Sequence, residues 1–312
     1  MELKLRVRTT TWETADIVSY ELRALDGSAL PPFSAGAHID LHLANGLIRS
    51  YSLVNPQAER HRYVIAVQKD RATRGGSKWV HEHLRAGDVI MVSAPRNNFP
   101  LAEDAAHSLL FAGGIGITPI MSMIERLSVL ERPWQLYYCA RTRAAAAFVD
   151  QLAGRSEVRF NFDREPGGAM LDMAPIIERA SKGTHFYCCG PLPMLNAFEA
   201  ITAGLPTELV HVEYFSAKEP PSHEGGFTVV LAKSGRQIPI PAGKTILDAL
   251  LEAGVDLPFS CKEGVCGTCE TAVLEGIPDH RDLILTKEEH AASRSMMICC
   301  SGSKSERLVL DL

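Results

Sequence analysis

The sequence predicts three successive folding units: a small antiparallel β-barrel, a parallel α/β domain and a cysteine-bearing C-terminal module. Three observations predict this order. Short alternating strands fill the first hundred residues, strands and helices alternate in the middle third, and four spaced cysteines lie near the C-terminus. The chain has 312 residues, and at about 150 residues per domain this length suits two domains or three small ones.

The N-terminal domain, placed at 1–102, contains short alternating segments at 3–8, 38–43 and 63–68, separated by Gly and Pro turns. We expect these segments to be strands of a small antiparallel barrel. Arg49-Ser50-Tyr51-Ser52-Leu53 ends another such strand, on which Arg49, Tyr51 and Leu53 share one face.

These residues suggest a site in the barrel. An arginine can bind a phosphate with its planar fork, and a tyrosine ring can carry a flat aromatic ligand. The turn Arg74-Gly75-Gly76-Ser77 is a second segment able to wrap a phosphate. Taken separately, an ordinary strand and an ordinary turn are the alternative interpretation.

The middle domain, placed at 103–216, begins with an apolar strand at 108–112 and a glycine-rich turn, Gly113-Gly114-Ile115-Gly116. We expect Thr118 to cap the following helix and Pro119 to occupy its first position. Backbone N–H groups at such a turn can bind a pyrophosphate. Because the glycines do not complete G-x-G-x-x-G, close packing of helix on sheet is the alternative explanation.

The segments at 135–140, 185–189 and 208–215 are the next predicted strands, and together with the first they predict a parallel sheet. Arg141-Thr142-Arg143 follows the first of them, where an acidic residue usually binds the ribose of NAD. NADPH therefore remains an alternative to NADH.

A polar stretch rich in proline and glycine at 217–226 predicts a linker to a third domain at 227–312. In this domain, strands at 227–233 and 237–240 form a hairpin, and a helix at 245–253 ends at Gly254. A hairpin, a helix and then a cysteine loop match the order of a plant-type ferredoxin, which indicates a β-grasp fold.

Cys261, Cys266 and Cys269 have C-x4-C-x2-C spacing, and with the distant Cys299 they form the ligand pattern of a plant-type [2Fe-2S] cluster. A four-thiolate zinc site and buried inert cysteines are the alternatives. Cys300 competes for the fourth position. The spacing favours Cys299, and in an extended strand Cys300 would point to the opposite side.

Composition excludes several classes of protein. No apolar run is long enough to span a membrane, and the net charge of -5 argues against nucleic acid as a partner. Eight cysteines in a chain of this length are too few for a disulfide scaffold. Because the sequence also lacks a signal-peptide pattern, we expect a cytoplasmic protein.

In combination, R-x-Y-S-L, G-G-S, G-G-I-G-I-T-P, C-G-P and the spaced cysteines resemble the phthalate dioxygenase reductase and vanillate demethylase reductase family over essentially the whole chain. The resemblance implies an FMN domain, an NAD domain and a plant-type ferredoxin domain. It places Arg49 and Ser77 on the FMN phosphate, Tyr51 and Ser52 against the isoalloxazine, and Phe215 over the flavin. The complete set of cofactor-binding residues is Arg49, Ser50, Tyr51, Ser52, Gly75, Gly76, Ser77, Gly114, Gly116, Thr118, Pro119, Arg141, Cys189, Gly190, Pro191 and Phe215, with Cys189 to Pro191 near the nicotinamide.

The implied function is a reductase component that passes electrons from NADH, through FMN and a [2Fe-2S] cluster, to a Rieske-type aromatic oxygenase or O-demethylase. A nicotinamide delivers two electrons as a hydride and a cluster accepts one at a time, so a flavin bridges the mismatch. No acid or base side chain is required, and no catalytic residue is assigned. A ferredoxin-like carrier without enzyme activity and a zinc-stapled binding module are the rival classes.

Overall fold

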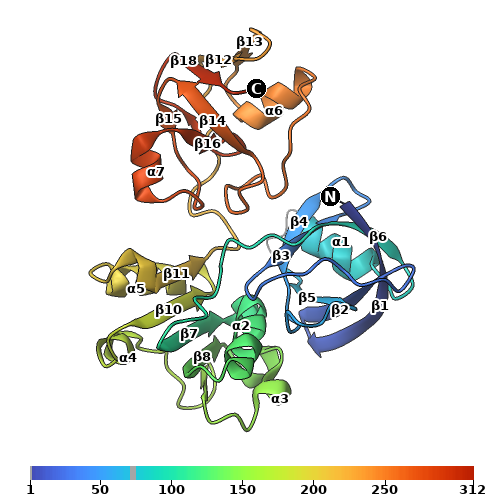
Figure 1. The fold of residues 1–312 in the computed structure, drawn as a ribbon, viewed down its shortest axis with the longest axis vertical. Coiled ribbons are helices and arrows are strands. Elements are labelled where there is room, and N and C mark those ends of the chain that lie inside the picture. The colour runs from blue at the N-terminus through green and yellow to red at the C-terminus, as the bar shows by residue number, and fades with distance from the viewer. Residues whose placement is uncertain (1, 71–74) are drawn as a thin grey trace. The chain divides into compact units, whose positions relative to one another are not determined.

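The computed structural model describes residues 2–70 and 75–312, which form two compact units, Met1–Glu213 and Tyr214–Leu312 (Figure 1). Within these described ranges, every helix is too short or too polar to cross a membrane. The predicted turn residue Arg74 lies outside the described residues.

The barrel in the first unit is built from antiparallel strands in the order β4-β3-β6-β1-β2-β5. Their bounds are β1 (Glu2–Thr14), β2 (Ile17–Ala24), β3 (His38–His42), β4 (Ile48–Ser52), β5 (Tyr63–Gln68) and β6 (Val89–Ser93). The two ends of this order meet, because Leu53 pairs with Ile65 and the Val54 N–H donates to the Val64 carbonyl at 2.8 Å. The sheet thus closes on itself around an apolar interior, which confirms the predicted barrel.

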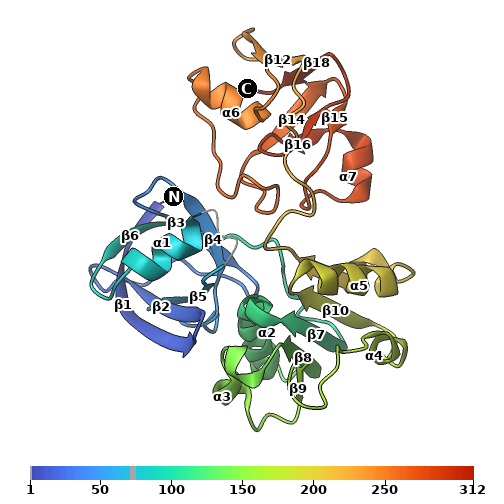
Figure 2. The same ribbon diagram turned by 180° about the vertical axis from the view of Figure 1, so that it is seen from behind.

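The second part of this unit is a parallel sheet in the order β11-β10-β7-β8-β9. The strands are β7 (His107–Gly113), β8 (Trp134–Ala140), β9 (Val158–Phe162), β10 (Thr184–Cys189) and β11 (Val210–Glu213); the helices are α2 (Ile117–Val129), α3 (Val149–Leu152), α4 (Ala174–Glu178) and α5 (Leu192–Thr202). Figures 1 and 2 show α2 and α3 on one side of the sheet and α4 and α5 on the other. The strand order reverses between β7 and β10, and ligands of open α/β sheets bind at the carboxyl ends of strands at such a point.

Two predicted boundaries in this domain are wrong. Helix α2 begins at Ile117, directly after a 3-10 turn at Gly114–Gly116, and the Thr118 hydroxyl donates to the Ile115 carbonyl at 2.9 Å instead of capping the helix. The 3-10 turn leads straight into α2, so Gly116 takes the capping position. The last strand ends at Glu213, two residues before the predicted end at Phe215.

The barrel and the α/β domain share one apolar core, in which Ile17, Val54 and Phe99 of the barrel side pack with Ile117 and Ile120 of α2. In addition, the Gly36 N–H donates to the buried Ser122 hydroxyl at 3.0 Å. This shared core explains why the chain divides into two compact units, not three. The predicted boundary at residue 102 stays a prediction.

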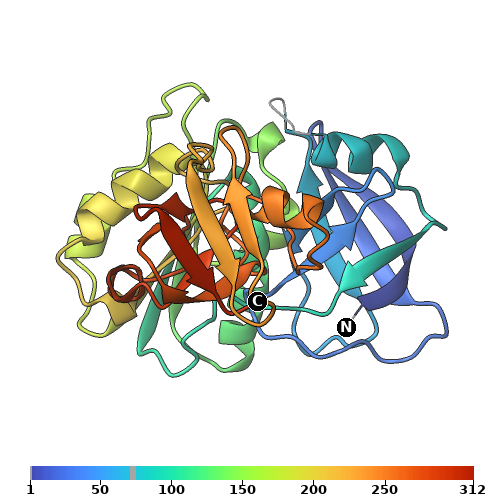
Figure 3. The same cartoon turned by 90° about the horizontal axis from the view of Figure 1, so that it is seen from above.

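The C-terminal unit holds a sheet in the order β13-β12-β18-β14-β16, with β12 and β18 parallel. Its elements are β12 (Phe227–Leu231), β13 (Gln237–Ile240), α6 (Ile246–Glu252), β14 (Glu270–Glu275), β15 (Pro278–Asp279), α7 (Lys287–Ala292), β16 (Ser295–Met297), β17 (Gly302–Ser303) and β18 (Arg307–Leu310). Thr245 caps α6 by accepting from the Asp248 N–H at 3.1 Å, and Leu247 and Leu250 of α6 are completely buried. Figure 3 shows α6, in orange, beside this sheet, the arrangement expected of a β-grasp domain.

Part of the predicted linker belongs to the C-terminal unit. The Ser222 N–H donates to the Cys300 carbonyl at 2.7 Å, and the Gly243 N–H donates to the His223 carbonyl at 2.8 Å. A Cβ added at Gly225 would overlap the backbone of Ala242. Residues from Ser222 onward are therefore part of the β-grasp fold.

Candidate cofactor sites

The cluster loop joins α6 to β14 and carries three of the four predicted ligands. Cys261, Cys266, Cys269 and Cys299 are all buried, at most 7% exposed. Between them, Lys262, Gly264 and Gly267 adopt left-handed backbone conformations, with φ of 57°, 71° and 75°. Such a conformation is costly for lysine, and an ion pair of 2.8 Å between Lys262 Nζ and Asp248 helps to hold it.

Three of the four cysteine side chains lie close together. The Cys261 thiol interacts with those of Cys266 and Cys299, and the Glu263 N–H donates to the Cys261 sulfur at 3.3 Å. The Cys261 thiol and burial together raise the pKa of Cys266, so thiolates here need a compensating positive charge, which irons supply. The four buried cysteines have the order and spacing of plant-type cluster ligands. The arrangement fits a two-iron cluster.

The predicted orientation of Cys300 is wrong. Residues 298–300 form a turn after β16, not an extended strand, and so neighbouring side chains do not alternate. The Cys300 sulfur lies against the cluster loop, 2.5 Å from the position that a Cβ on Gly264 would take. Cys299 remains the predicted fourth ligand, but orientation no longer excludes Cys300.

Separate replacement of the two cysteines tests this assignment. Cys299→Ser should lower the iron content well below two atoms per chain, because it removes a thiolate that closes the cluster, whereas Cys300→Ser should retain both irons. Iron and acid-labile sulfide analysis of each purified variant, with its visible spectrum, measures the difference. Iron loss confined to Cys300→Ser would make Cys300 the ligand.

On the barrel, the predicted phosphate-binding residues lie together. Gly75 has φ of 94° and precedes α1 (Gly76–His83), which contacts β5. A Cβ added at Gly76 would lie 2.6 Å from Arg49 Nε, so the Arg49 side chain crosses the start of α1. Ser77 Oγ, in the same turn, accepts from the Asp70 N–H at 3.2 Å. A guanidinium beside the N–H groups at the start of a helix is a fitting cradle for the FMN phosphate.

The other predicted flavin-binding residues of β4 are Ser50, Tyr51 and Ser52. The Ser50 hydroxyl donates to Asp40 at 2.7 Å, and Asp40 also pairs with Arg96 at 2.7 Å. Burial raises the pKa of Tyr51, and Ser52 is almost completely buried. The predicted contacts of Ser50, Tyr51 and Ser52 with the flavin stay predictions. Because the Ser50 hydroxyl donates to Asp40, Ser50 would contact the flavin through its backbone.

In the α/β domain, the glycine turn after β7 meets the carboxyl end of β10. A Cβ added at Gly116 would overlap the Cys189 carbonyl oxygen, and one at Gly113 would lie 2.6 Å from Pro191 Cδ and 3.2 Å from Gly190 Cα. Gly114 has φ of 54° and open space beside it. These close backbone approaches bring together the nucleotide-binding residues predicted from two distant segments, at the point where the strand order reverses.

Two further predicted cofactor-binding residues are Arg141 and Phe215. Arg141 is exposed and follows β8 at the same edge of the sheet. Phe215 is 40% exposed and lies beyond β11, in the chain segment grouped with the C-terminal unit. Its role as a cover for the flavin stays a prediction.

Glu213 is a candidate that the sequence raised only together with His211, as two possible ligands of an iron site, and interpreted as an ordinary polar residue at a strand end. It ends β11 directly opposite Cys189 in the parallel pairing, beside the predicted nicotinamide site. Burial raises the pKa of its carboxyl group to about 8. The one available signal was its position, an acidic residue at the carboxyl end of a strand, and that signal becomes specific only when the strand order is known.

The raised pKa of Glu213 predicts a pH dependence. Between its ordinary pKa of 4.5 and about 8, the folded protein holds a proton that the unfolded chain releases, so this group should reduce stability as the pH rises through that interval. Glu213→Gln should flatten the fall in melting temperature between pH 5 and pH 8. Parallel slopes for the wild type and the variant would contradict the assignment.

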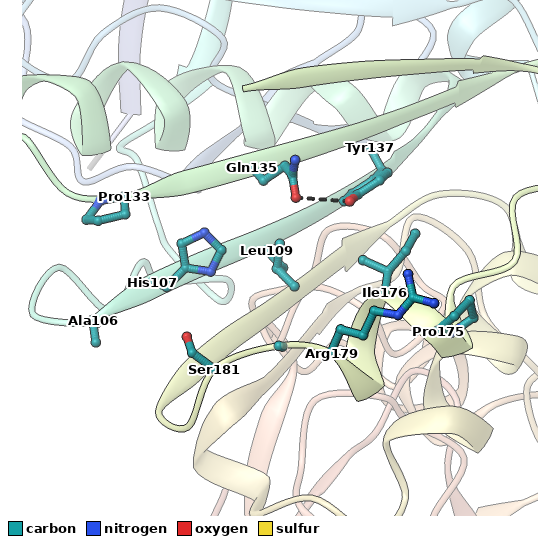
Figure 4. A pocket seen from close by; sticks show the side chains of 11 residues that line it. Ala106, His107, Leu109, Pro133, Gln135, Tyr137, Pro175, Ile176, Arg179 and Ser181 are labelled. Atoms are coloured by element: carbon teal, nitrogen blue, oxygen red, sulfur yellow. Dashed lines mark hydrogen bonds between the residues drawn. The ribbon is translucent and has the colours of Figure 1, made fainter. Parts of the chain in front are cut away.

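A cavity of about 610 Å³ lies elsewhere, between β7, β8 and α4 (Figure 4). His107 and Leu109 line it from the amino-terminal part of β7, with Gln135 and Tyr137 of β8 across from them. This is the opposite end of β7 from Gly113, so the cavity is separate from the nucleotide-binding edge. We assign no cofactor to this cavity.

The fold and these sites define a nucleotide- and flavin-binding iron–sulfur oxidoreductase. Residues 229–303 match the family model described as a 2Fe-2S iron-sulfur cluster binding domain. The chain is 55% identical to phenoxybenzoate dioxygenase subunit beta of Ectopseudomonas oleovorans, over 99% of this chain and 97% of that protein. It is 46% identical to vanillate O-demethylase oxidoreductase of Pseudomonas sp. (strain HR199 / DSM 7063), over 95% of this chain and 96% of that one.

Comparison with solved structures indicates the same family as the sequence relatives. The structure of phthalate dioxygenase reductase, titled a modular structure for electron transfer from pyridine nucleotides to [2Fe-2S], matches 100% of this chain and 98% of its own at 40% identity, with a TM-score of 0.77. An intact type IV self-sufficient cytochrome P450 monooxygenase matches with a TM-score of 0.88 and 39% identity, but this chain spans 41% of it.

The chain belongs to the phthalate dioxygenase reductase and vanillate demethylase reductase family. This confirms the predicted family, the fold class of barrel, α/β and ferredoxin domains, and the enzyme class, an NAD(P)H-dependent flavin and iron–sulfur oxidoreductase.

Proposed function

We propose that this chain is the reductase component of an aromatic oxygenase or O-demethylase system and delivers electrons from NADH to a Rieske-type terminal oxygenase. The observation that carries the proposal is the presence of three sites in one chain: the Arg49–Gly76 cradle, the nucleotide-binding edge between Gly116 and Cys189, and the four-cysteine loop. The names of the full-length relatives, a dioxygenase subunit and an O-demethylase oxidoreductase, support the same class of system.

The side chains and backbone of this protein bind and position the cofactors. Arg49, Gly76 and Ser77 would hold the FMN phosphate, with Tyr51 and Ser52 along the ring. Gly114, Gly116, Thr118, Pro119 and Arg141 would hold the pyridine nucleotide, with Cys189, Gly190 and Pro191 near the nicotinamide. Bound FMN supplies the conversion of a two-electron hydride into single electrons.

At the cluster loop, the protein controls the environment of the sulfurs. Plant-type clusters have potentials near about -400 mV, which burial and N–H donors to sulfur adjust. The cysteines are buried, and the Glu263 N–H donates to the Cys261 sulfur at 3.3 Å. This chain thus sets the potential of its cluster through its backbone.

We place the three functions in domains 1–102, 103–216 and 227–312, and we propose a cytoplasmic protein. Within the described part of the chain, no disulfide joins any of the eight cysteines, which suits a reducing compartment as well as thiolate ligation. The resemblance to part of a cytochrome P450 means that a haem enzyme is the main competing partner class.

Reconstitution distinguishes these partners. The chain, loaded with FMN and cluster, is mixed with a purified Rieske-type oxygenase and its aromatic acid or aryl ether substrate, and separately with a P450 that lacks its own reductase. We expect NADH oxidation coupled to product only with the Rieske enzyme. Coupled turnover with the P450 alone would overturn the partner assignment.

Delivery to the oxygenase should also depend on salt. A transient, partly electrostatic encounter slows when dissolved ions screen the attraction between the two proteins. The screening length of the solution falls from about 10 Å at 0.1 M salt to about 3 Å at 1 M salt. Reduction of the oxygenase should therefore slow over this range, while reduction of an uncharged quinone by the same preparation changes little. A rate to the oxygenase that is independent of salt would contradict electrostatic docking.

A further inference from the structure

A second group of metal-ligand side chains lies in the C-terminal unit, apart from the four cluster cysteines. His280, Asp282 and His290 place their ligand atoms within 4.8 Å of one another. The proposed electron-transfer function leaves this group without a role.

Regular structure positions the two histidines. His280 directly follows β15, which pairs with β17, and His290 is in α7. A capping box between Thr286 and Glu289 fixes the start of α7. The two imidazole rings stack with centroids 4.3 Å apart. Both histidines are therefore positioned by backbone pairing and capping, not by chance contact at the surface.

Asp282 is a buried carboxylate beside the two histidines. Its side chain is completely buried, and its carboxylate accepts from the Leu285 N–H at 2.9 Å and the Ile284 N–H at 3.3 Å. His290 Nε2 lies 3.2 Å from both carboxylate oxygens. These contacts hold the carboxylate toward the two imidazoles, and a buried carboxylate is expected to have a cationic partner.

His280 is the residue that points most directly to a ligand. Its side chain is only 9% exposed, and neither ring nitrogen has a hydrogen-bond partner among the described residues. Nδ1 lies 3.6 Å from Asp282 Oδ1, too far for a hydrogen bond. Leaving a buried polar group without a partner is costly, and a bound cation would remove that cost.

We propose that His280, Asp282 and His290 bind a divalent transition-metal ion, with Zn²⁺ as the preferred ion. Two imidazoles and a carboxylate are suitable zinc ligands, and three protein ligands leave one position for water. Ligand atoms on a tetrahedral zinc lie about 3.4 Å apart, so atoms now within 4.8 Å of one another must approach by up to about 1.4 Å, with one stacked ring turning toward the ion.

The site adjoins the cluster loop. The Leu283 N–H donates to the Gly264 carbonyl at 2.9 Å, and a Cβ added at Gly264 would lie 3.0 Å from the Asp282 Cα. An ion bound to Asp282 would restrict the motion of residues 282–283, which contact Gly264. Zinc should therefore also slow the loss of cluster iron during incubation with an iron chelator that does not bind zinc.

Equilibrium dialysis of the holoprotein against micromolar free Zn²⁺ tests the proposal, with zinc and iron counted in the same samples. We expect one zinc per chain for the wild type and at least about tenfold weaker binding for both His280→Gln and His290→Gln. His83→Gln, which removes a stacked histidine of the first unit, is the matched control and should bind as the wild type does.

Iron content separates the possible results. Unchanged iron in the variants, together with lost zinc, assigns the zinc to this site. Wild-type protein that binds no more zinc than either variant, or zinc uptake accompanied by an equal loss of iron, would overturn the proposal. Neither result bears on electron delivery to the oxygenase.

Discussion

Replacing Cys266 by serine should abolish electron transfer to acceptors that draw on the cluster while leaving NADH-dependent flavin reduction intact. Cys266 is buried in the loop of the C-terminal unit, and the proposed flavin and nucleotide residues Arg49, Gly76 and Gly116 belong to the first unit. Loss of one thiolate should therefore remove the cluster without disturbing hydride transfer.

Two acceptors measure the separation. Cytochrome c reduction through the cluster should fall to background in Cys266→Ser, and stopped-flow bleaching of the flavin by NADH should stay within about twofold of the wild type. Cys139→Ser, a change in the first unit outside the proposed ligand set, is the control and should affect neither rate. Equal loss of both activities in Cys266→Ser would show that cluster and flavin do not act in series.

Replacing Gly116 by alanine should weaken both nucleotide binding and the fold. The new Cβ would overlap the Cys189 carbonyl oxygen and lie 2.8 Å from the Gly190 nitrogen, and backbone atoms cannot turn aside as a side chain does. The carboxyl ends of β7 and β10 must then separate, at a cost of about 1–3 kcal/mol in the free energy of unfolding. Because the nucleotide lies on these ends, KM for NADH should rise roughly tenfold or more.

Gly204→Ala is the matched control for this variant. A Cβ at Gly204 meets nothing within 4 Å, so melting temperature and KM should stay at wild-type values. Thermal unfolding and steady-state kinetics at varied NADH measure both effects. A Gly116→Ala protein with wild-type KM would contradict the placement of the nucleotide at this edge.

The sequence was most informative where function depends on local spacing. The C-x4-C-x2-C pattern lies on one loop, so its chemistry is visible before the fold is known. Strands with clear alternation were also placed well: the predicted segments 63–68 and 237–240 coincide with β5 and β13. The order of strands and helices was enough to predict three architectures in the correct sequence.

The errors arose where distant segments decide the local structure. Thr118 follows a glycine turn and was expected to cap α2, but the turn continues into the helix and buries Ile117 completely. Cys300 was assigned a direction from strand periodicity, although the chain turns there to meet Gly264. Glu213 and the Asp40–Arg96 pair gain their surroundings only when separate strands come together.

The most direct test of the account is an anaerobic titration of the purified holoprotein with NADH, followed by visible absorption and electron paramagnetic resonance. Two electrons for the flavin and one for the cluster predict full reduction at about 1.5 NADH per chain, with a signal from the reduced cluster. Reduction complete at about 1 NADH per chain, with the flavin bleached and no cluster signal, would contradict the claim that one chain converts a hydride into single electrons.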